Sequence, residues 1–245
     1  MDKPKRIRID KLLMDHGYFD SRERAQRSIL AGYVLIKEQV IDKPGTLVRS
    51  DAVIRVIAEE KYVGRGGYKL EAALDHFGIN TIDRVCLDVG ASTGGFTDCL
   101  LQRGAKKVIA VDVGHHQLAW KIRSDIRVEV HEGLNARTLG PELIGTRVQL
   151  AVVDVSFISL TLVLHPIFAC VEAGGMVIAL IKPQFELEPR QVGKGGIVRE
   201  EQLRMRSVQK IQLFVVEDLH REWLGFIESP ITGAKGNREF LACLR

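Results

Sequence analysis

Two charged residues of this sequence stand directly after runs of apolar residues. Asp154 follows the run Leu150–Val153, and Lys182 follows the run Val177–Ile181. Such runs are typical of buried strands, and ligands and reacting groups gather where parallel strands end. A charge at such a point is costly unless it is paired or used. Either residue alone would be an ordinary charge at a sheet edge, but together, beside the same crevice, they predict an interacting pair.

A glycine-rich loop follows an earlier apolar run, Val85–Val89, and opens a helical stretch. It reads Leu87-Asp-Val-Gly-Ala-Ser-Thr-Gly-Gly-Phe96, and its glycines let the backbone approach a ligand closely. A dinucleotide-binding loop would read G-x-G-x-x-G, which this loop does not. Its form, D-x-G-x-x-x-G-G, instead fits a loop that binds S-adenosylmethionine; the alternative is a plain structural turn. The predicted cofactor-binding residues of the loop are Asp88, Gly90, Ala91, Ser92, Gly94, Gly95 and Phe96.

Two polar residues that follow the next two strands extend the predicted cofactor site. Asp112 ends the second strand, where a carboxylate can accept hydrogen bonds from both hydroxyls of a ribose. Asn135 follows the third strand and is placed to reach the edge of an adenine. For Asn135 an ordinary surface role fits the sequence equally well.

Strands and helices alternate along the second part of the chain. Five apolar runs rich in β-branched residues are separated by helical stretches, which predicts an α/β fold with a doubly wound parallel sheet. A tight, turn-rich join at 229–237 predicts that the last two strands form a hairpin with one antiparallel edge. The expected strands are 85–89, 107–113, 128–131, 148–155, 176–181, 223–228 and 239–244. The expected helices are 96–103, 116–123, a stretch after 138, 159–172 and 200–214.

The first 60 residues predict a separate unit of two short helices and a small sheet. A helix from Arg8 ends at Gly17, and a capping box at Asp20–Glu23 starts a helix over 21–31. In the second helix Ala25, Ile29 and Leu30 point to the core, whereas the arginines lie outside this stripe. Strands are expected at 33–36 and 53–57, with a turn at 42–45.

A charged, glycine-rich segment separates this unit from the rest of the chain. We place the domains at residues 1–60 and 68–245, with a linker at 61–67. A helix over 68–77 opens the second domain. It carries Lys69 in its first turn, where a cation is unfavourable for the helix dipole and hints at another use.

Charge and composition narrow the class of protein. Residues 1–69 contain 15 Lys or Arg and 10 Asp or Glu, whereas residues 70–245 contain 20 and 21. A basic N-terminal segment on an otherwise nearly neutral chain is expected to bind a polyanion. Four scattered cysteines suit free thiols in a reducing cytosol. The charged N-terminus, without an apolar stretch after it, predicts no secretory signal, and the most apolar window, 160–181, is interrupted by charges and glycines, so no membrane span is expected.

The front unit closely resembles the RNA-binding fold first known from small-subunit ribosomal protein four. The pattern consists of Arg8, Asp10 and Leu13, followed by Ser21, Arg22, Ala25, Ile29, Gly32 and Val34. The resemblance implies that the helix that carries the arginines docks on structured RNA through phosphate contacts and shape. A small interaction module without RNA is the alternative. The predicted RNA-binding residues are Arg8, Lys11, Arg22, Arg24, Arg27 and Arg65.

Residues 68–245 resemble the FtsJ-like RNA 2′-O-methyltransferases, and with the front unit the whole chain is similar to the TlyA family, also labelled hemolysin A. This resemblance implies a Rossmann-like class I methyltransferase with a seven-stranded, mostly parallel sheet. It also implies a catalytic Lys-Asp-Lys-Glu tetrad. By their motifs its members match Lys69, Asp154, Lys182 and Glu239, with Glu228 as a weaker candidate for the glutamate.

The resemblance implies a cytoplasmic enzyme that methylates a ribose 2′-hydroxyl in ribosomal RNA, with cytidine as the expected nucleoside. Its expected partners are ribosomal RNA or ribosomal subunits, with no membrane, and no metal because a sulfonium methyl donor needs no metal activation. An amino-methyltransferase would carry an N/D-P-P-Y/F run, and Asp154-Val-Ser-Phe157 lacks both prolines. A short-chain dehydrogenase needs Tyr-x-x-x-Lys, which occurs only at Tyr33 and Lys37, before the cofactor loop. The remaining alternatives are a non-catalytic RNA-binding assembly factor and, far behind it, a cytolysin.

Overall fold

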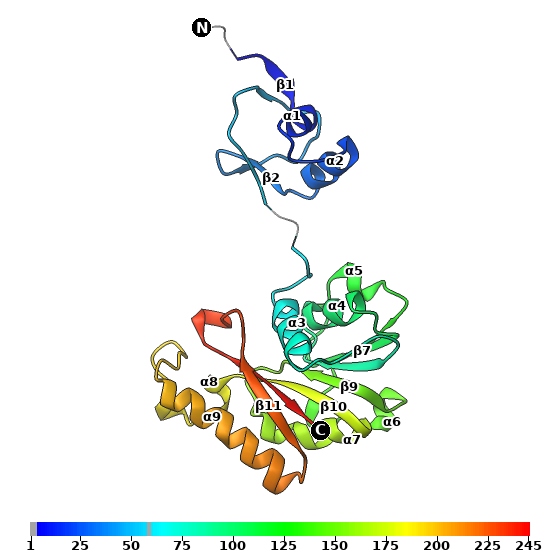
Figure 1. The fold of residues 1–245 in the computed structure, drawn as a ribbon, viewed down its shortest axis with the longest axis vertical. Helices are drawn as coiled ribbons and strands as arrows, with labels where there is room; N and C mark the ends of the chain where they lie inside the picture. Colours follow the sequence, from blue (N-terminus) through cyan, green and yellow to red (C-terminus); the bar gives the residue numbers. More distant parts are fainter. Residues whose placement is uncertain (1–3, 58–59) are drawn as a thin grey trace. The chain divides into compact units, whose positions relative to one another are not determined.

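The computed structural model describes residues 4–57 and 60–245 of the chain. They form two compact units, Met1–Lys61 and Tyr62–Arg245 (Figure 1). The charged start of the chain through Lys3 lies outside the described residues. So does Glu59, the first residue of the charged segment at the predicted domain boundary.

The first unit packs two helices against short antiparallel strands. The helices are α1 (Ile9–Asp15) and α2 (Arg22–Leu30). A three-stranded sheet has β2 (Val34–Ile36) at its centre, between β3 (Gln39–Val40) and β5 (Ile54–Val56), and β1 (Arg6–Arg8) pairs with β4 (Leu47–Arg49). The buried core consists of Ile9, Leu12, Leu13, Ala25, Ile29, Val34 and Ile54.

Two details of α2 differ from the sequence expectation. The residue that caps its N-terminus is Ser21, whose hydroxyl accepts a hydrogen bond from the backbone of Arg24, whereas Asp20 forms a salt bridge with the side chain of Arg24. Leu30 is 67% exposed instead of buried. Because it directly follows the buried Ile29, it lies about 100° further round the helix and off the apolar stripe.

The second unit is built on a seven-stranded sheet in the order β11–β12–β10–β9–β6–β7–β8. Six strands are parallel to one another, and β12 is antiparallel to both of its neighbours. The fold class predicted from the sequence is confirmed, but the antiparallel strand is not at the edge: β12 inserts between β10 and β11. The strands are β6 (Val85–Val89), β7 (Lys107–Asp112), β8 (Val128–Glu132), β9 (Val148–Val153), β10 (Val171–Ile181), β11 (Trp223–Glu228) and β12 (Phe240–Leu244).

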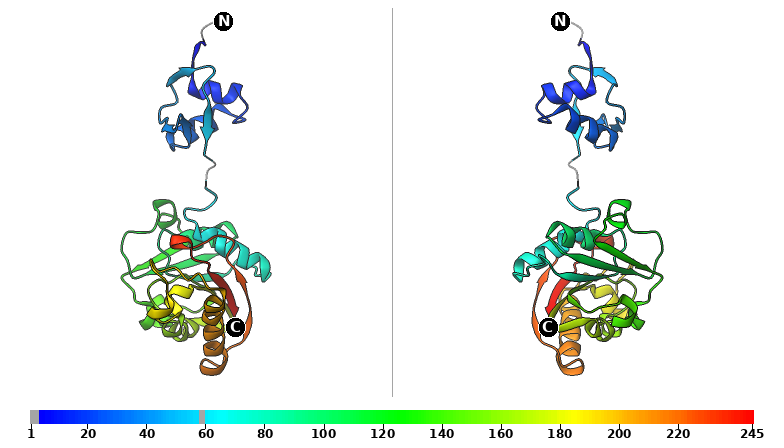
Figure 2. Two further views of the ribbon diagram at one scale, coloured as in Figure 1. Left: turned by 90° about the vertical axis from the view of Figure 1, so that its left-hand side faces the viewer. Right: turned by 90° about the vertical axis from the view of Figure 1, so that its right-hand side faces the viewer.

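Helices cover both faces of this sheet (Figure 2). Alternate side chains of each strand point to opposite faces, so Cys86 packs with one helical layer and Leu87 with the other. One layer contains α3 (Gly66–His76), α4 (Gly95–Gln102) and α5 (Trp120–Arg123). The other contains α6 (Pro141–Ile144), α7 (Leu164–Ala169) and α9 (Glu201–Leu213). The short helix α8 (Pro183–Glu186) follows β10 directly.

Several elements are shorter or longer than the sequence predicts. Only α5 forms within 116–123. The expected helix 159–172 is divided into a 3₁₀ turn, η2 (Leu160–Leu162), then α7, then the start of β10. This strand begins at Val171 because the glycine pair forms an irregularity within the strand, with Gly174 at φ +77°, instead of a turn before it. At the other end of the chain α9 continues into the π-helical segment η4 (Phe214–Asp218).

Most of the segment predicted as a linker packs onto the second unit. Tyr62 is 2% exposed, and the backbone N–H of Val63 donates a hydrogen bond to the Asp98 carboxylate at 2.9 Å. Helix α3 begins at Gly66, before the expected Tyr68. The segment therefore forms part of the surroundings of the cofactor loop.

No helix among the described residues is long and apolar enough to cross a membrane. The four cysteines are free and buried. Within the same residues no group of three or more His, Cys, Asp or Glu side chains could hold a metal ion.

Candidate active site

The sheet topology brings the cofactor loop and Asp154 together. Strand β6 lies between β7 and β9. After β6 the chain forms β7 and β8 on one side of it, and then crosses over to form β9 and β10 on the other side. Ligand sites of doubly wound sheets lie at such a switch point, beyond the carboxyl ends of the strands. The approach is close: a Cβ atom on Gly90, which has φ +86°, would lie 2.5 Å from the carbonyl oxygen of Asp154. Only glycine fits this position.

Asp154 and Lys182 form the pair expected from their positions at the ends of β9 and β10. The Lys182 Nζ lies 2.6 Å from Asp154 Oδ1 and donates a hydrogen bond to the Ser156 hydroxyl at 2.7 Å. The contact with Oδ1 is an ion pair without the angle of a hydrogen bond. Lys182 is 9% exposed. Its buried ammonium therefore depends on two partners, Asp154 and Ser156, which lie on the same loop.

A second buried ion pair joins Lys69 to Glu239. Their Nζ and Oε2 atoms lie 2.5 Å apart, and the residues are 8% and 2% exposed. Glu239 directly precedes β12, and a Cβ on Gly233 in the preceding turn would collide with its Oε1. The competing Glu228 forms a salt bridge with Arg238 that is exposed on both sides, so the geometry favours Glu239.

The two ion pairs meet at the same end of the sheet. Ile181 of β10 pairs with Phe240 of β12, so the residues next outward, Lys182 and Glu239, lie at adjacent strand ends. Helix α3, which carries Lys69, begins beside Asp154, since a Cβ on Gly66 would lie 3.9 Å from Asp154 Oδ2. The tertiary structure therefore gathers all four predicted tetrad residues, from α3, β9, β10 and β12.

Asp112 holds the cofactor loop in place. Its two carboxylate oxygens accept hydrogen bonds from the backbone N–H groups of Ser92 and Gly114, each at 2.7 Å. Each oxygen keeps a second lone pair, so Asp112 can still accept hydrogen bonds from ribose hydroxyls. A narrow hollow opens beside it. Its lining residues are Ala91, Ser92, Ala110, Asp112, Gly114, Gln117, Leu118, Val130 and Glu132.

Asp88 lies fully buried under the same loop. Its Oδ2 accepts a hydrogen bond from the Thr97 hydroxyl at 2.6 Å, and its Oδ1 has no hydrogen-bond partner in the described residues. Burial, with a smaller contribution from the negative charges of Asp154 and Asp112, raises the pKa of Asp88 to about 7. Asp88 therefore lies beneath the loop, whereas Asp112 borders the hollow and is the carboxylate available to ribose hydroxyls, an arrangement that fits an adenosine cofactor.

Six of the nine predicted cofactor-binding residues do not line the hollow: Asp88, Gly90, Gly94, Gly95, Phe96 and Asn135. Phe96 is buried beneath the start of α3, where a Cβ on Gly66 would lie 3.2 Å from its ring. Asn135 is exposed and caps the 3₁₀ turn η1 (Ala136–Thr138) by accepting a hydrogen bond from the backbone of Arg137. Its contact with adenine therefore stays a prediction.

Among the residues of the site that were not predicted, four carry a polar side chain or an exposed ring. Glu132 ends β8 and could have been found by the rule that identified Asp154, but Gln117 stands in an irregular segment that carries no signal. Ser156 contacts Lys182 because of the path of the loop after β9, and neighbouring residues in the sequence do not determine that path. Phe157 is 89% exposed at φ +62°, a conformation unusual for an aromatic residue, and its ring lies 5.0 Å from that of Phe185.

The predicted RNA-binding residues of the first unit divide into two groups. Arg8 and Arg22 donate hydrogen bonds to the buried Asp10, and together with Gln26 they hold the pKa of that carboxyl well below its usual range. Arg24 and Arg27 instead border a surface hollow of about 490 Å³ along α2. Lys11 is exposed. Arg65 belongs to the second unit, where its guanidinium donates to the carbonyl of Thr232 at 2.8 Å.

Comparison with protein families agrees with this arrangement. Residues 62–245 match the FtsJ-like methyltransferase family, and residues 7–54 match the S4 domain. The chain therefore belongs to the FtsJ-like methyltransferase family.

Individual proteins similar to this chain give a more specific comparison than the family models do. The chain is 45% identical over 243 residues to the 16S/23S rRNA (cytidine-2′-O)-methyltransferase TlyA of Mycobacterium tuberculosis, which covers 98% of this chain and 90% of the relative. It is 43% identical to Hemolysin A of Brachyspira hyodysenteriae, over 96% of this chain and 98% of the relative. A solved structure described as a "putative hemolysin" from Streptococcus thermophilus has a TM-score of 0.74 at 42% identity and covers 99% of this chain and 89% of its own. The resemblance to the TlyA family drawn from the motifs is confirmed.

Proposed function

We propose that this chain transfers a methyl group from S-adenosylmethionine to the 2′-hydroxyl of a cytidine in ribosomal RNA. The nucleoside and the RNA class are those of the TlyA relative. The first unit docks on the RNA, and the second unit carries out the transfer.

The observation that carries this proposal is the pair of buried ion pairs beside the glycine loop. Lys182–Asp154 and Lys69–Glu239 place four charges at one end of the sheet. Asp154 and Lys182 follow β9 and β10, whereas Glu239 precedes the antiparallel β12 and Lys69 lies in the first turn of α3. Burying so many charges in pairs gives little stability compared with apolar residues of similar volume. Their position next to a cofactor loop therefore favours a catalytic role for both pairs.

The residues of the site divide the work of the reaction among them. When bound, S-adenosylmethionine supplies a methyl group attached to a sulfonium, and the thioether released on transfer is a good leaving group. Asp154 and Ser156 hold the Lys182 Nζ beside the ribose 2′-hydroxyl, which is a poor nucleophile. In its neutral form this amine accepts the hydroxyl proton as the oxygen attacks the methyl carbon, whereas as an ammonium it only orients the hydroxyl oxygen. Lys69 and Glu239 orient the ribose, so that the hydroxyl oxygen is in line with the methyl carbon.

The surface beside Lys182 supports an unpaired nucleotide as the acceptor. The Phe157 ring projects into solvent from a residue next to Ser156, and Lys182 lies 5.9 Å from the Phe185 ring. Enzymes that act on single-stranded RNA stack unpaired bases on such exposed aromatic rings. We place the reaction in the cytoplasm, where ribosomal RNA and ribosomal subunits are found.

The test is a map of 2′-O-methyl marks on ribosomal RNA from cells with and without this chain. We expect one or a few cytidines to lose their mark when the chain is absent. Purified chain, given labelled S-adenosylmethionine, should then restore the mark on RNA or ribosomal subunits from the deficient cells. RNA binding without any methyl transfer would instead indicate a non-catalytic assembly factor.

A further inference from the structure

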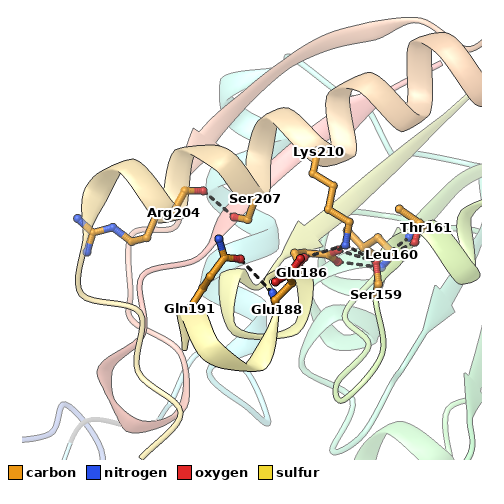
Figure 3. Close-up of polar contacts among 9 residues, drawn as sticks. All are labelled: Ser159, Leu160, Thr161, Glu186, Glu188, Gln191, Arg204, Ser207 and Lys210. Atoms are coloured by element: carbon orange, nitrogen blue, oxygen red, sulfur yellow. Dashed lines mark hydrogen bonds and ion pairs between the residues drawn. The ribbon is translucent and has the colours of Figure 1, made fainter. Parts of the chain in front are cut away.

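A buried carboxylate outside the tetrad joins the two loops that carry the catalytic groups. Glu186, at the end of α8, is 5% exposed. Its Oε1 accepts a hydrogen bond from the backbone N–H of Leu160 at 2.8 Å, and its Oε2 accepts one from the Ser159 hydroxyl at 2.5 Å (Figure 3). A buried carboxylate persists only when it is paired and hydrogen-bonded, and here both oxygens are used.

The cation that pairs with Glu186 comes from a third element. Lys210 of α9 places its Nζ 3.0 Å from Glu186 Oε2 and donates to the Glu186 carbonyl at 2.8 Å and to the Ser159 hydroxyl at 3.2 Å (Figure 3). Glu186, Ser159 and Lys210 therefore form one cluster, called here the anchoring cluster. It ties the loop after β9 and the turn after β10 to helix α9.

The loop after β9 needs such an anchor. It carries Asp154 and Ser156, the two partners of Lys182, and then Phe157 at φ +62°. A non-glycine residue in this conformation costs free energy and persists only where its surroundings hold it. One end of the loop is fixed by the hydrogen bond from Asp154 N to Val89 O at 2.9 Å. The other end is fixed by Ser159 and the backbone of Leu160, both on Glu186.

The same carboxylate also fixes the segment of Lys182. The backbone of Phe185 donates to the Lys182 carbonyl at 2.9 Å, so one short turn connects Lys182 to Glu186. A shift of Glu186 relative to Ser159 would therefore move Lys182 relative to Asp154 and Ser156.

We propose that the anchoring cluster is a positioning device for methyl transfer, which holds Asp154 and Ser156 around the amine of Lys182. The inference rests on the proposed function. Glu186 does not touch the reacting atoms and acts only through the two loops. A misplacement of about 1 Å in such a group can lower the rate of a reaction about a hundredfold.

The test compares Glu186→Gln and Lys210→Met in the full chain. Both changes keep side-chain size but remove the ion pair. We expect kcat for methylation of ribosomal RNA to fall at least tenfold, while the KM for RNA and the Kd for S-adenosylmethionine stay within about twofold of wild type. Lys210→Arg keeps a cation beside Glu186 and should recover most of kcat.

Two matched variants serve as controls. Glu188→Gln removes a carboxylate two residues further along the same segment, where Glu188 is exposed and pairs with Arg190. Arg206→Met removes an exposed cation from the same helix as Lys210. Both should keep kcat within twofold, and the melting temperature of all variants should be measured alongside.

Two outcomes would overturn the inference. One is a folded Glu186→Gln chain with near-normal kcat. The other is a parallel fall of melting temperature, cofactor affinity and kcat, which would mean that the cluster only stabilises the fold. A wild-type chain that transfers no methyl group would overturn the proposed function itself, and this inference with it.

Discussion

The charges of the active site are arranged in pairs whose members depend on each other. Lys182 is almost buried, with its side chain 11% exposed, and Asp154 is its anionic partner at 2.6 Å. Removal of one partner leaves the other charge without compensation where it is largely buried. The functional loss from either change should therefore include the loss of the whole pair.

At Lys182 we expect the largest loss of activity. Lys182→Ala should abolish nearly all methyl transfer, with S-adenosylmethionine affinity and RNA binding within a few fold of wild type. Asp154→Ala should behave alike, and the double variant should be no worse than the worse single variant, because residues that act as a unit are not additive. Lys69→Ala and Glu239→Ala should cost a similar amount or less. Single-turnover methylation assays measure this, and a folded Lys182→Ala chain with normal turnover would contradict the assignment.

Asp88 predicts a pH dependence of stability. Burial raises its pKa to about 7, whereas an aspartate of the unfolded chain titrates near ~3.9. The folded state therefore binds this proton more tightly, and the contribution of Asp88 to the free energy of unfolding falls as the pH rises from about 4 to 7. Asp88→Asn, which cannot titrate, should gain up to about 4 kcal/mol relative to wild type over this range, at about 1.36 kcal/mol per pKa unit. Urea unfolding at several pH values measures the difference, and a constant difference would show that Asp88 ionises normally.

Among the elements, helix α2 has two kinds of arginine. Arg22 donates to the buried Asp10 and so helps to hold α1 against α2, whereas Arg27 borders the surface hollow and lies outside the core stripe. The same residue type therefore serves stability at one position and is free to contact phosphate at another.

This difference can be measured through the salt dependence of RNA binding. Arg27→Ala should weaken RNA binding and reduce the slope of log K against log salt by about 0.7–0.9, which corresponds to one phosphate contact. Arg22→Ala should also lower the melting temperature of the first unit. Arg49→Ala, which removes an exposed arginine of β4 that pairs with Asp51, is the control for net charge. Equal salt slopes for the Arg27 and Arg49 variants would argue against a specific contact at α2.

For the molecule as a whole, the predicted RNA contacts of α2 and the candidate active site lie in different units. The cofactor hollow and both buried ion pairs are built from residues after Tyr62, which begins the second unit. The hollow bordered by Arg24 and Arg27 belongs to the first unit.

Deletion of residues 1–61 should therefore separate the two activities. We expect the chain 62–245 to bind S-adenosylmethionine within a few fold of the full chain and to lose methylation of ribosomal RNA. Calorimetry and a methyl-transfer assay measure the two effects. If the shortened chain methylates ribosomal RNA as well as the full chain does, the first unit has no docking role.

The sequence by itself determined the elements whose signals are local. The strand bounds of β6 and β11 match the expectation, because alternation of side chains is a property of consecutive residues. Asp154 and Lys182 could be paired in advance because both follow buried strands that end at the same edge of a parallel sheet. Lys69 stood out locally as a cation in the first turn of a helix. Its place in the tetrad, and Glu239 itself, were reached only through the resemblance to a family, since nothing in their neighbourhoods connects residues so far apart.

Only the tertiary structure decided the contacts that depend on strand order and loop course. The insertion of β12 between β10 and β11 places Glu239 next to Lys182, and neighbouring residues do not encode which strands become partners. The Ser156 contact depends on a loop with an unusual backbone at Phe157, and the Glu186–Lys210 pair depends on the packing of α8 against α9. Sequence patterns report which residues are buried in an element, whereas the packing of distant elements decides which buried charges meet.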